Sequence, residues 1–217
     1  MRRTGPTTWA LLAFTALTLT SGCGSDAEPK SGEACSYPVD GGAAKEVRPP
    51  STADVATSGS TTSVLKTSVG DIRITMDRAK APCAVHSFAS LAQQGYFDQT
   101  SCHRLTTQGI FVLQCGDPTG TGSGGPGYSF ADETTGQESY TKGVVAMANS
   151  GPDSNGSQFF LVYDDSTGLD PKYTVFGSMD AASVAVVAKV AAGGTDQPGD
   201  GAPLRPVKIS TVTSTTS

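Results

Sequence analysis

Three stretches of the chain set polar side chains among apolar ones at spacings that could serve chemistry. They read His103-Arg104-Leu105, Phe111-Val112-Leu113-Gln114-Cys115-Gly116-Asp117, and MANSGPDSNGSQFF over residues 147–160. A guanidinium such as that of Arg104 stays protonated and donates strong hydrogen bonds, so it can stabilise a group that becomes basic during a reaction. No suitably spaced base accompanies Cys102 or Cys115, which argues against a thiol nucleophile. The stretches therefore predict electrostatic stabilisation and need no nucleophile, metal or nucleotide.

The stretch at residues 147–160 has the composition of a surface loop. Gly, Pro, Asn, Asp and Ser crowd its middle, and Asn155-Gly156 tolerates the positive φ of a tight turn. It joins two apolar runs and ends in Gln158-Phe159-Phe160, which is unusual for a plain connector. We therefore interpret it as both a connector and one wall of a site.

The elements that must position these residues follow from hydrophobic periodicity. Ile72, Ile74 and Met76 alternate with polar residues, which predicts a strand with one buried face. Apolar stripes predict helices over residues 82–94, which Gly95 ends, and over 181–192. Many short strands with two helices are typical of a mainly β domain, which we expect to be a closed barrel capped by the helices. Further strands are predicted over residues 64–68, 101–105, 111–114, 144–148, 158–163, 173–177 and 206–212.

The N-terminus has the pattern of an export signal. A short positive region, Met1-Arg2-Arg3, precedes an apolar run over residues 9–19 that is too short to span a bilayer. The sequence Leu19-Thr20-Ser21-Gly22-Cys23 resembles a bacterial lipobox, with Thr20 where that motif prefers Leu, Val or Ile. We expect a signal peptide over residues 1–22 and a lipidated, palmitate-bearing Cys23 that anchors the protein outside the cytoplasm. An ordinary secretory signal, which would release a secreted protein, is the alternative.

Composition sets the domain organisation. With 217 residues, 37% of them hydrophobic, the chain suits one well-buried core. Residues 23–62 are poor in apolar periodicity and predict a flexible tether, in which Cys35 is the exception because a disulfide could pin it; the domain then covers residues 63–217. A net charge of -5 without a basic cluster argues against nucleic-acid binding.

Four cysteines remain beside Cys23, namely Cys35, Cys83, Cys102 and Cys115. An exported protein permits disulfides, and three pairings are open. No C-x-x-C spacing marks a metal site, and we predict neither a metal nor another cofactor. The pattern Gly120-x-Gly122-x-x-Gly125 matches a dinucleotide motif, but Pro126-Gly127 follow it and no helix begins there. A thiol oxidoreductase is an alternative that rests on the cysteine count alone.

The three motifs together, in this order, resemble the cyclophilin family of peptidyl-prolyl cis-trans isomerases. The resemblance runs from about residue 64 to residue 213, and Cys115 replaces a glycine of the family's F-x-x-Q-G-G-D motif. It implies a closed antiparallel eight-stranded β-barrel capped by two helices. It also implies a monomer that isomerises X–Pro bonds, here in exported proteins at the membrane surface.

The resemblance also assigns roles. Arg104 would be the catalytic arginine, Gln158 would steady it, and Asn149 would grip the substrate backbone. Phe111, Val112, Phe160 and Leu169 would wall the pocket for the proline ring, while the loop at residues 120–122 would border the pocket for the residue two before proline. The implied substrate-binding residues are Phe111, Val112, Gln114, Gly120, Thr121, Gly122, Ala148, Ser150, Phe160, Leu169 and Tyr173.

Two departures from the family pattern bear on activity. The connection Thr106-Thr107-Gln108-Gly109-Ile110 is two residues longer than usual, and Gly168 and Tyr173 stand where many members carry tryptophan and histidine. The lost indole predicts weak binding of cyclosporin-type macrocycles. The alternative function is therefore a proline-peptide binding or chaperone module with little or no turnover.

Overall fold

The structure, a computed structural model, describes residues 1–2, 5 and 35–216. The chain separates into two units, Met1–Lys30 and Ser31–Ser217, and the second holds nearly all of the described residues. Cys23, the first part of the tether and, apart from residues 1–2 and 5, the signal peptide fall outside the described residues and stay predictions. Within the described ranges, no helix has the length and apolar character needed to cross a bilayer.

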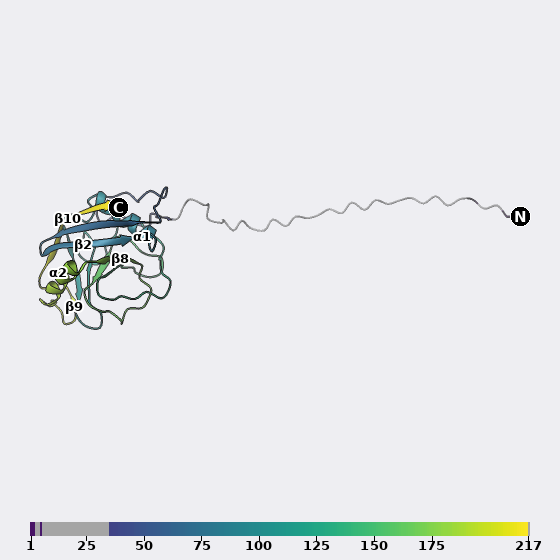
Figure 1. Ribbon diagram of the computed structural model, residues 1–217. Coiled ribbons are helices and arrows are strands. Elements are labelled where there is room, and N and C mark those ends of the chain that lie inside the picture. The colour runs from purple at the N-terminus through teal and green to yellow at the C-terminus, as the bar shows by residue number, and fades with distance from the viewer. Residues whose placement is uncertain (3–4, 6–34, 217) are drawn as a thin grey trace. The chain divides into compact units, whose positions relative to one another are not determined.

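Mostly short strands and two helices make up the described domain (Figure 1). The predicted helices are confirmed to within a residue or so, and the strand predictions are confirmed to within about four residues at their ends. Their bounds are β1 Ser60–Thr67, β2 Gly70–Asp77, α1 Pro82–Gln93, β3 Thr100–Cys102, β4 Arg104–Thr106, β5 Val112–Cys115, β6 Val144–Met147, β7 Phe159–Val162, β8 Val175–Met179, α2 Ala181–Ala191, β9 Asp200–Gly201 and β10 Val207–Thr216.

The strands form one sheet in the order β3-β10-β1-β2-β8-β6-β7-β5-β4-β9, and every pairing in it is antiparallel. The prediction of a closed eight-stranded barrel is wrong, because this ten-stranded sheet is open between β3 and β9. The predicted strand over residues 101–105 divides at His103, so β3 pairs with β10 while β4 pairs with β5 and β9. The two-residue strand β9 is too short to leave a periodic signal in the sequence.

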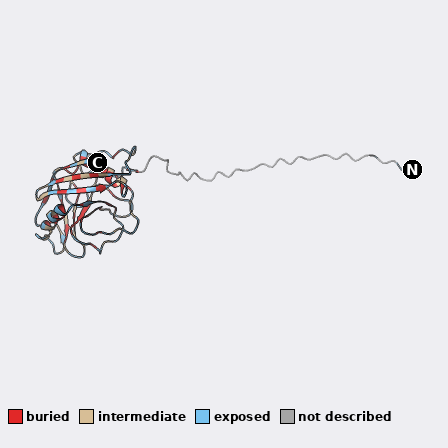
Figure 2. Cartoon of the chain, viewed as in Figure 1, coloured by how far each residue is buried: buried red, intermediate tan, exposed pale blue. Residues whose placement is uncertain are grey.

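The sheet buries side chains on both faces. In β2 the residues Ile72, Ile74 and Met76 are buried and their neighbours are exposed, as predicted, and Figure 2 shows this alternation along the strand. In β7 all four residues are buried, because Phe159 and Leu161 join the main core while Phe160 and Val162 point to the opposite face. A second, smaller apolar cluster therefore lies across β5, β6, β7 and β8; its buried members are Val112, Tyr140, Ala146, Phe160, Val162 and Val175.

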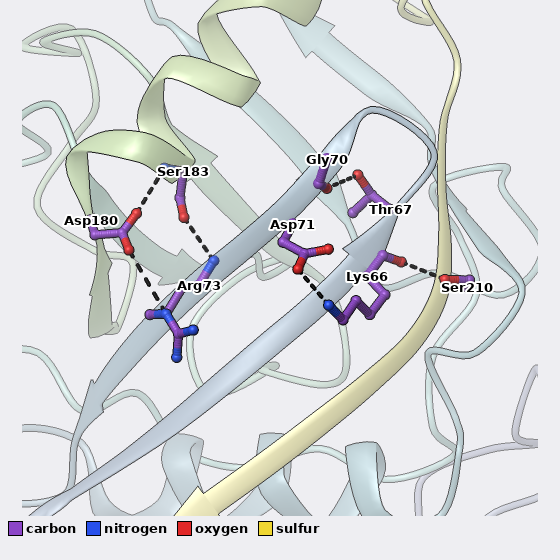
Figure 3. Close-up of polar contacts among 8 residues, drawn as sticks. All are labelled: Lys66, Thr67, Gly70, Asp71, Arg73, Asp180, Ser183 and Ser210. Atoms are coloured by element: carbon purple, nitrogen blue, oxygen red, sulfur yellow. Dashed lines mark hydrogen bonds and ion pairs between the residues drawn. The ribbon is translucent and has the colours of Figure 1, made fainter.

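Polar side chains fix both helix starts. Asp180 accepts a hydrogen bond from the amide of Ser183 at the start of α2, and the Ser183 hydroxyl accepts one from the amide of Arg73 in β2 (Figure 3). The start of α1 has no cap from its own segment; instead the carboxylate of Glu133 accepts hydrogen bonds from the amides of Cys83 and Ala84, each 2.8 Å long. These contacts satisfy amides that a helix start otherwise leaves free.

The N-terminal segment, which we define as residues 35–59, packs on the domain. Cys35 and Tyr37 are buried in the main core, and the Tyr37 ring meets Tyr128 and Phe130 edge-on. Further along, the amide of Arg48 donates to the side chain of Gln94 at the end of α1. The prediction of a flexible tether up to residue 62 is therefore wrong from Cys35 onward, because a few aromatic and cysteine contacts anchor a segment whose average composition is that of a linker.

Two disulfides settle the pairing that the sequence left open. Cys35 bonds to Cys83 at the start of α1, and Cys102 of β3 bonds to Cys115 of β5. All four cysteines of the described domain are thus oxidised. The thiol oxidoreductase alternative loses its basis, since no free thiol remains in this part of the chain.

Candidate active site

The residues that the resemblance assigns to the wall of the proline pocket gather mostly in the second cluster. Phe160 and Val112 are buried there, and the ring of Tyr173 stands perpendicular to that of Phe160 with centroids 5.5 Å apart. Ala148 and Leu169 are half-buried and pack against the same cluster. The structure thus brings together five of the residues that the sequence assigned to the groove.

The charged group of the site lies in register with this wall. Arg104 of β4 pairs with Gln114 of β5, Gln114 pairs with Phe160 of β7, and Phe160 pairs with Ala146 of β6. Directly opposed residues in antiparallel strands point to the same face of a sheet. Arg104 and Phe160 therefore face the same side, two strands apart, with Gln114 between them.

A chain of hydrogen bonds connects three of the predicted side chains. Arg104 Nη1 donates to Gln114 Oε1 over 3.3 Å, and Gln114 Nε2 donates to Gln158 Oε1 over 2.8 Å. Gln158 Nε2 in turn donates to the carbonyls of Gly122 and Gly124. Gln158 thus acts on Arg104 through Gln114, and it also holds the loop that contains Gly122 and Gly124.

Asp200 holds the other side of the arginine. Arg104 Nε and Nη2 donate to the two carboxylate oxygens of Asp200 over 2.8 and 2.6 Å. The hydrogen bond to Asp200 raises the pKa of Arg104, and the bond from Arg104 lowers the pKa of Asp200. The guanidinium is therefore charged and held from both sides.

The loop after β5 is organised by a buried carboxylate. Asp117 has no exposed surface and accepts hydrogen bonds from the amides of Thr119, Thr121, Gly122 and Gly124. Burial alone would raise the pKa of Asp117, but the hydrogen bonds from the Thr119 side chain and from the amides outweigh it and lower that pKa. An ionised Asp117 thus fixes the carbonyls on which Gln158 depends.

The loop at residues 147–160 is cross-linked through its own side chains. Asn149 Nδ2 donates to Asp132 Oδ1 and to the carbonyl of Lys172, and the amide of Ser150 donates to Ser154 Oγ. Buried Asn155 also donates to Asp132. The side chain of Asn149 therefore fastens the loop to its neighbours, which leaves its main chain as the group that can meet a peptide.

A polar hollow of about 570 Å³ adjoins these residues. Its lining includes residues 122–129 and the side of the site formed by Gln114, Ala148, Asn149, Ser150 and Gln158. Gly122 belongs to its lining, whereas Gly120 and Thr121, which the sequence also placed at a groove, are exposed and do not. Residues 40–42 of the N-terminal segment also line the hollow.

Phe111 lies apart from the other predicted wall residues. Its ring is half-buried, packs against the main core and meets Tyr163 edge-on at 6.0 Å. Its neighbour Val112 points into the second cluster, because adjacent residues of an extended chain face opposite sides. The structure thus groups Val112, but not Phe111, with Phe160.

The two departures from the family pattern lie side by side. A Cβ placed on Gly168 would lie 3.3 Å from the carbonyl oxygen of Gly109 and 3.6 Å from Ile110 Cγ2. The longer connection at residues 106–110 therefore occupies space beside Gly168, and Ile110 packs against the second cluster. A large side chain at residue 168 would have to displace this connection.

Sequence reasoning missed Asp200 and Tyr140. The Tyr140 hydroxyl donates to the carbonyl of Tyr173 and accepts from its amide, and burial raises the pKa of Tyr140 to about 12. Asp200 lies 96 residues from Arg104, in the two-residue strand β9, which is too short to show a periodic pattern. Nothing in the sequence near either residue points to the site, so only the folded chain reveals them.

Comparison with known proteins identifies the family of this chain. The family described as "Cyclophilin type peptidyl-prolyl cis-trans isomerase/CLD" matches residues 62–214. A relative in Mycobacterium leprae, "Probable peptidyl-prolyl cis-trans isomerase B", is 47% identical over 184 residues, which cover 78% of this chain and 62% of the relative. A protein of the same description in Mycobacterium tuberculosis is 46% identical over 197 residues, covering 83% of this chain and 64% of that one. This chain thus spans a little less than two thirds of the length of these relatives.

A solved structure supports the fold. The crystal structure of a cyclophilin type peptidyl-prolyl cis-trans isomerase from Cryptosporidium parvum, obtained in the presence of the dipeptide Ala-Pro, aligns with a TM-score of 0.63 and 28% identity. The alignment covers 72% of this chain and 99% of that protein.

Proposed function

Because the chain belongs to the cyclophilin-type peptidyl-prolyl cis-trans isomerase family, we propose that it catalyses rotation about X–Pro bonds, with Arg104 as the catalytic residue. One observation carries the proposal. Arg104, Gln114 and Phe160 stand in one register row across three strands and face the same side of the sheet. A cation and an apolar wall are thereby set on the same face of the sheet, two strands apart.

The reaction needs a hydrogen-bond donor that meets the prolyl nitrogen only near the transition state. Rotation about the X–Pro bond is slow because amide resonance stiffens the C–N bond, with a barrier of about 20 kcal/mol. As the bond twists, conjugation is lost and the prolyl nitrogen regains a basic lone pair. A guanidinium hydrogen bond to that nitrogen forms only near the transition state, and an interaction of this kind accelerates the reaction.

Arg104 has N–H groups left to donate to the prolyl nitrogen. A guanidinium carries five N–H groups. Asp200 takes one from Nε and one from Nη2, and Gln114 takes one from Nη1. One N–H on each terminal nitrogen remains for the substrate, in an orientation that the other three bonds hold.

The apolar wall would immobilise the proline ring while Arg104 binds the prolyl nitrogen. Phe160, Val112 and Leu169 would hold the proline ring still, while Tyr173 closes the side where other members carry histidine. The two hydrogen bonds between Tyr140 and the main chain of Tyr173 keep that ring in place. The main chain at Asn149 would hold the flanking peptide, so that twisting is confined to the X–Pro bond.

The test is isomerisation of an X–Pro peptide by the full-length chain and by Arg104→Ala. A charge-assisted hydrogen bond contributes about 1.5–3 kcal/mol, so the variant should lose about ten- to a hundredfold in kcat/KM. Arg104→Lys is the matched control for charge, because lysine keeps the cation but cannot form the three-sided bonding of the guanidinium; it should recover only a small part of the loss. Equal rates in the wild type and Arg104→Ala would sink the mechanism.

The same experiment separates the alternative function. A proline-peptide binding module would bind the peptide while its exchange rate stayed at the spontaneous value. The observation that favours a binding module is the contact of Gly168 with Gly109 and Ile110, since it changes the wall beside the proposed proline pocket.

We further infer that the clients are exported proteins and that the enzyme is tethered outside the cytoplasm through a lipidated Cys23. The lipobox-like residues 19–23 and the two disulfides of the domain support this location, because disulfides persist in oxidising compartments. Mass spectrometry of the mature N-terminus checks it. A diacylated Cys23 is the expected result, and an unmodified N-terminus at another residue would contradict it.

A further inference from the structure

The polar hollow beside the site is shared by two parts of the chain that lie far apart in sequence. Gln114 and Gln158 belong to the site, whereas Asp40, Gly41 and Gly42 come from the N-terminal segment. All of them line the same volume of about 570 Å³. The N-terminal segment is therefore a wall of the hollow and not a passive link to the membrane.

This wall is firmly attached. The amide of Asp40 donates to the carbonyl of Gly127 over 3.1 Å, and the amide of Ala44 donates to the carbonyl of Gly125 over 2.8 Å. The two backbones approach so closely that a Cβ on Gly127 would lie 2.8 Å from the Ala43 nitrogen, and Gly127 has a φ of +80°. On the N-terminal side of this contact, the Cys35–Cys83 disulfide links the segment to α1. The wall is therefore held on both sides of residues 40–42.

The lining of the hollow carries one kind of charge. Asp40 is the one ionisable acid or base among the described lining residues apart from the phenol of Tyr128; the others are Gly, Ser, Gln, Asn, Ala and Pro. The Asp40 side chain is exposed, and no ion pair or hydrogen bond of its carboxylate is found within residues 35–216. An unpaired carboxylate at the rim of a polar hollow attracts an ammonium or guanidinium group and repels a carboxylate.

We propose that residues 40–42 form the outer wall of the pocket for the side chain two residues before the substrate proline, and that Asp40 makes this pocket select lysine or arginine there. The proposal rests on the proposed function, because that function has the main chain at Asn149 hold the flanking peptide, and Asn149 lines the hollow. It makes the N-terminal segment a specificity element of the site.

The experiment measures binding and exchange separately. Peptides of the form Xaa-Ala-Pro-Phe, with Xaa as Lys, Ala or Glu, are titrated into the full-length chain by NMR, and their cis–trans exchange rates are read from the same samples. Asp40→Asn removes the charge, Asp40→Lys reverses it, and Glu46→Gln is the matched control, because Glu46 is exposed on the same segment but does not line the hollow. An exposed charge pair predicts that the wild type binds the lysine peptide about two- to fivefold more tightly than the alanine peptide at low salt.

Each outcome decides the question. The lysine preference should vanish in Asp40→Asn, turn into a glutamate preference in Asp40→Lys, and persist in Glu46→Gln. Equal binding of the lysine and glutamate peptides by the wild type would overturn the proposal even if exchange is accelerated, in which case the proposed function stands. A lysine preference without accelerated exchange would support the pocket and refute the catalysis, and binding of none of the peptides would overturn both.

Discussion

Asp200 offers the sharpest test of how this site is built, because it binds Arg104 through two hydrogen bonds and the proposed mechanism assigns it no contact with the substrate. The variant Asp200→Asn keeps the size of the side chain but removes its charge and one of its two acceptor oxygens. Arg104 would then retain Gln114, whose hydrogen bond at 3.3 Å is the longest of the three. We expect the guanidinium to lose its fixed orientation while staying charged.

The magnitude follows from the exposure and geometry of the pair. The two side chains are 41% and 51% exposed, so the salt bridge is screened and contributes at most about 1 kcal/mol to stability despite its bidentate geometry. Ordering a free arginine side chain costs up to about 2 kcal/mol, and Gln114 still supplies part of that order. We therefore expect Asp200→Asn to lose about three- to tenfold in kcat/KM, which is less than Arg104→Ala loses.

The assay is the exchange rate of an X–Pro peptide at pH 7, at about 0.05 and 0.5 M salt. Higher salt should bring the wild type toward the variant, because it weakens an exposed ion pair. Asp71→Asn is the control, since it breaks the Lys66–Asp71 pair of similar exposure on the β1–β2 hairpin (Figure 3) and should not change the rate. The pKa of Asp200 is lowered in the folded state, so its effect should be constant above about pH 4 and fade as the pH falls through that lowered pKa. An unchanged or faster rate in Asp200→Asn would refute the reasoning, because Asp200 would then be idle or would hold Arg104 away from the substrate.

Two further predictions concern the supports of the site. Asp117→Asn should lower the free energy of unfolding at pH 7 by about 1–3 kcal/mol, because several loop amides lose a charged acceptor. Since the folded state lowers the pKa of Asp117, this difference from the wild type should be full above about pH 4 and should shrink as the pH falls through that lowered pKa. Urea denaturation at several pH values measures it. A constant difference down to pH 2 would contradict an ionised Asp117. Removing the Cys35–Cys83 disulfide in Cys35→Ser/Cys83→Ser should cost about 4 kcal/mol by the loop-entropy relation for a separation of 48 residues, and thermal unfolding beside the wild type checks this. A loss below about 1 kcal/mol would mean that the N-terminal segment stays in place without its bond.

Much of the local structure could be read from the sequence, because it depends on short-range patterns. The alternation of Ile72, Ile74 and Met76 was sufficient for β2, and Pro82 and Gly95 bounded α1. The strand at residues 101–105 shows the limit of such patterns. Its residues are extended as predicted, but the break at His103 sends β3 and β4 to different partners, and that choice opens the sheet.

The site divides in the same way. The motifs by themselves predicted which residues form the groove, since Arg104, Gln114, Gln158 and Phe160 belong to contiguous stretches whose spacing resembles one family. Only the tertiary structure decided what surrounds them: the grip of Asp200 on Arg104, the relay through Gln114, the hydroxyl of Tyr140 behind Tyr173, and the place of residues 40–42 in the wall of the hollow. The physical reason is that a motif records neighbours along the chain. The contacts of Tyr140 with Tyr173, of Gln114 with Gln158 and of Arg104 with Asp200 join residues 33, 44 and 96 positions apart, which become neighbours only when the sheet has folded.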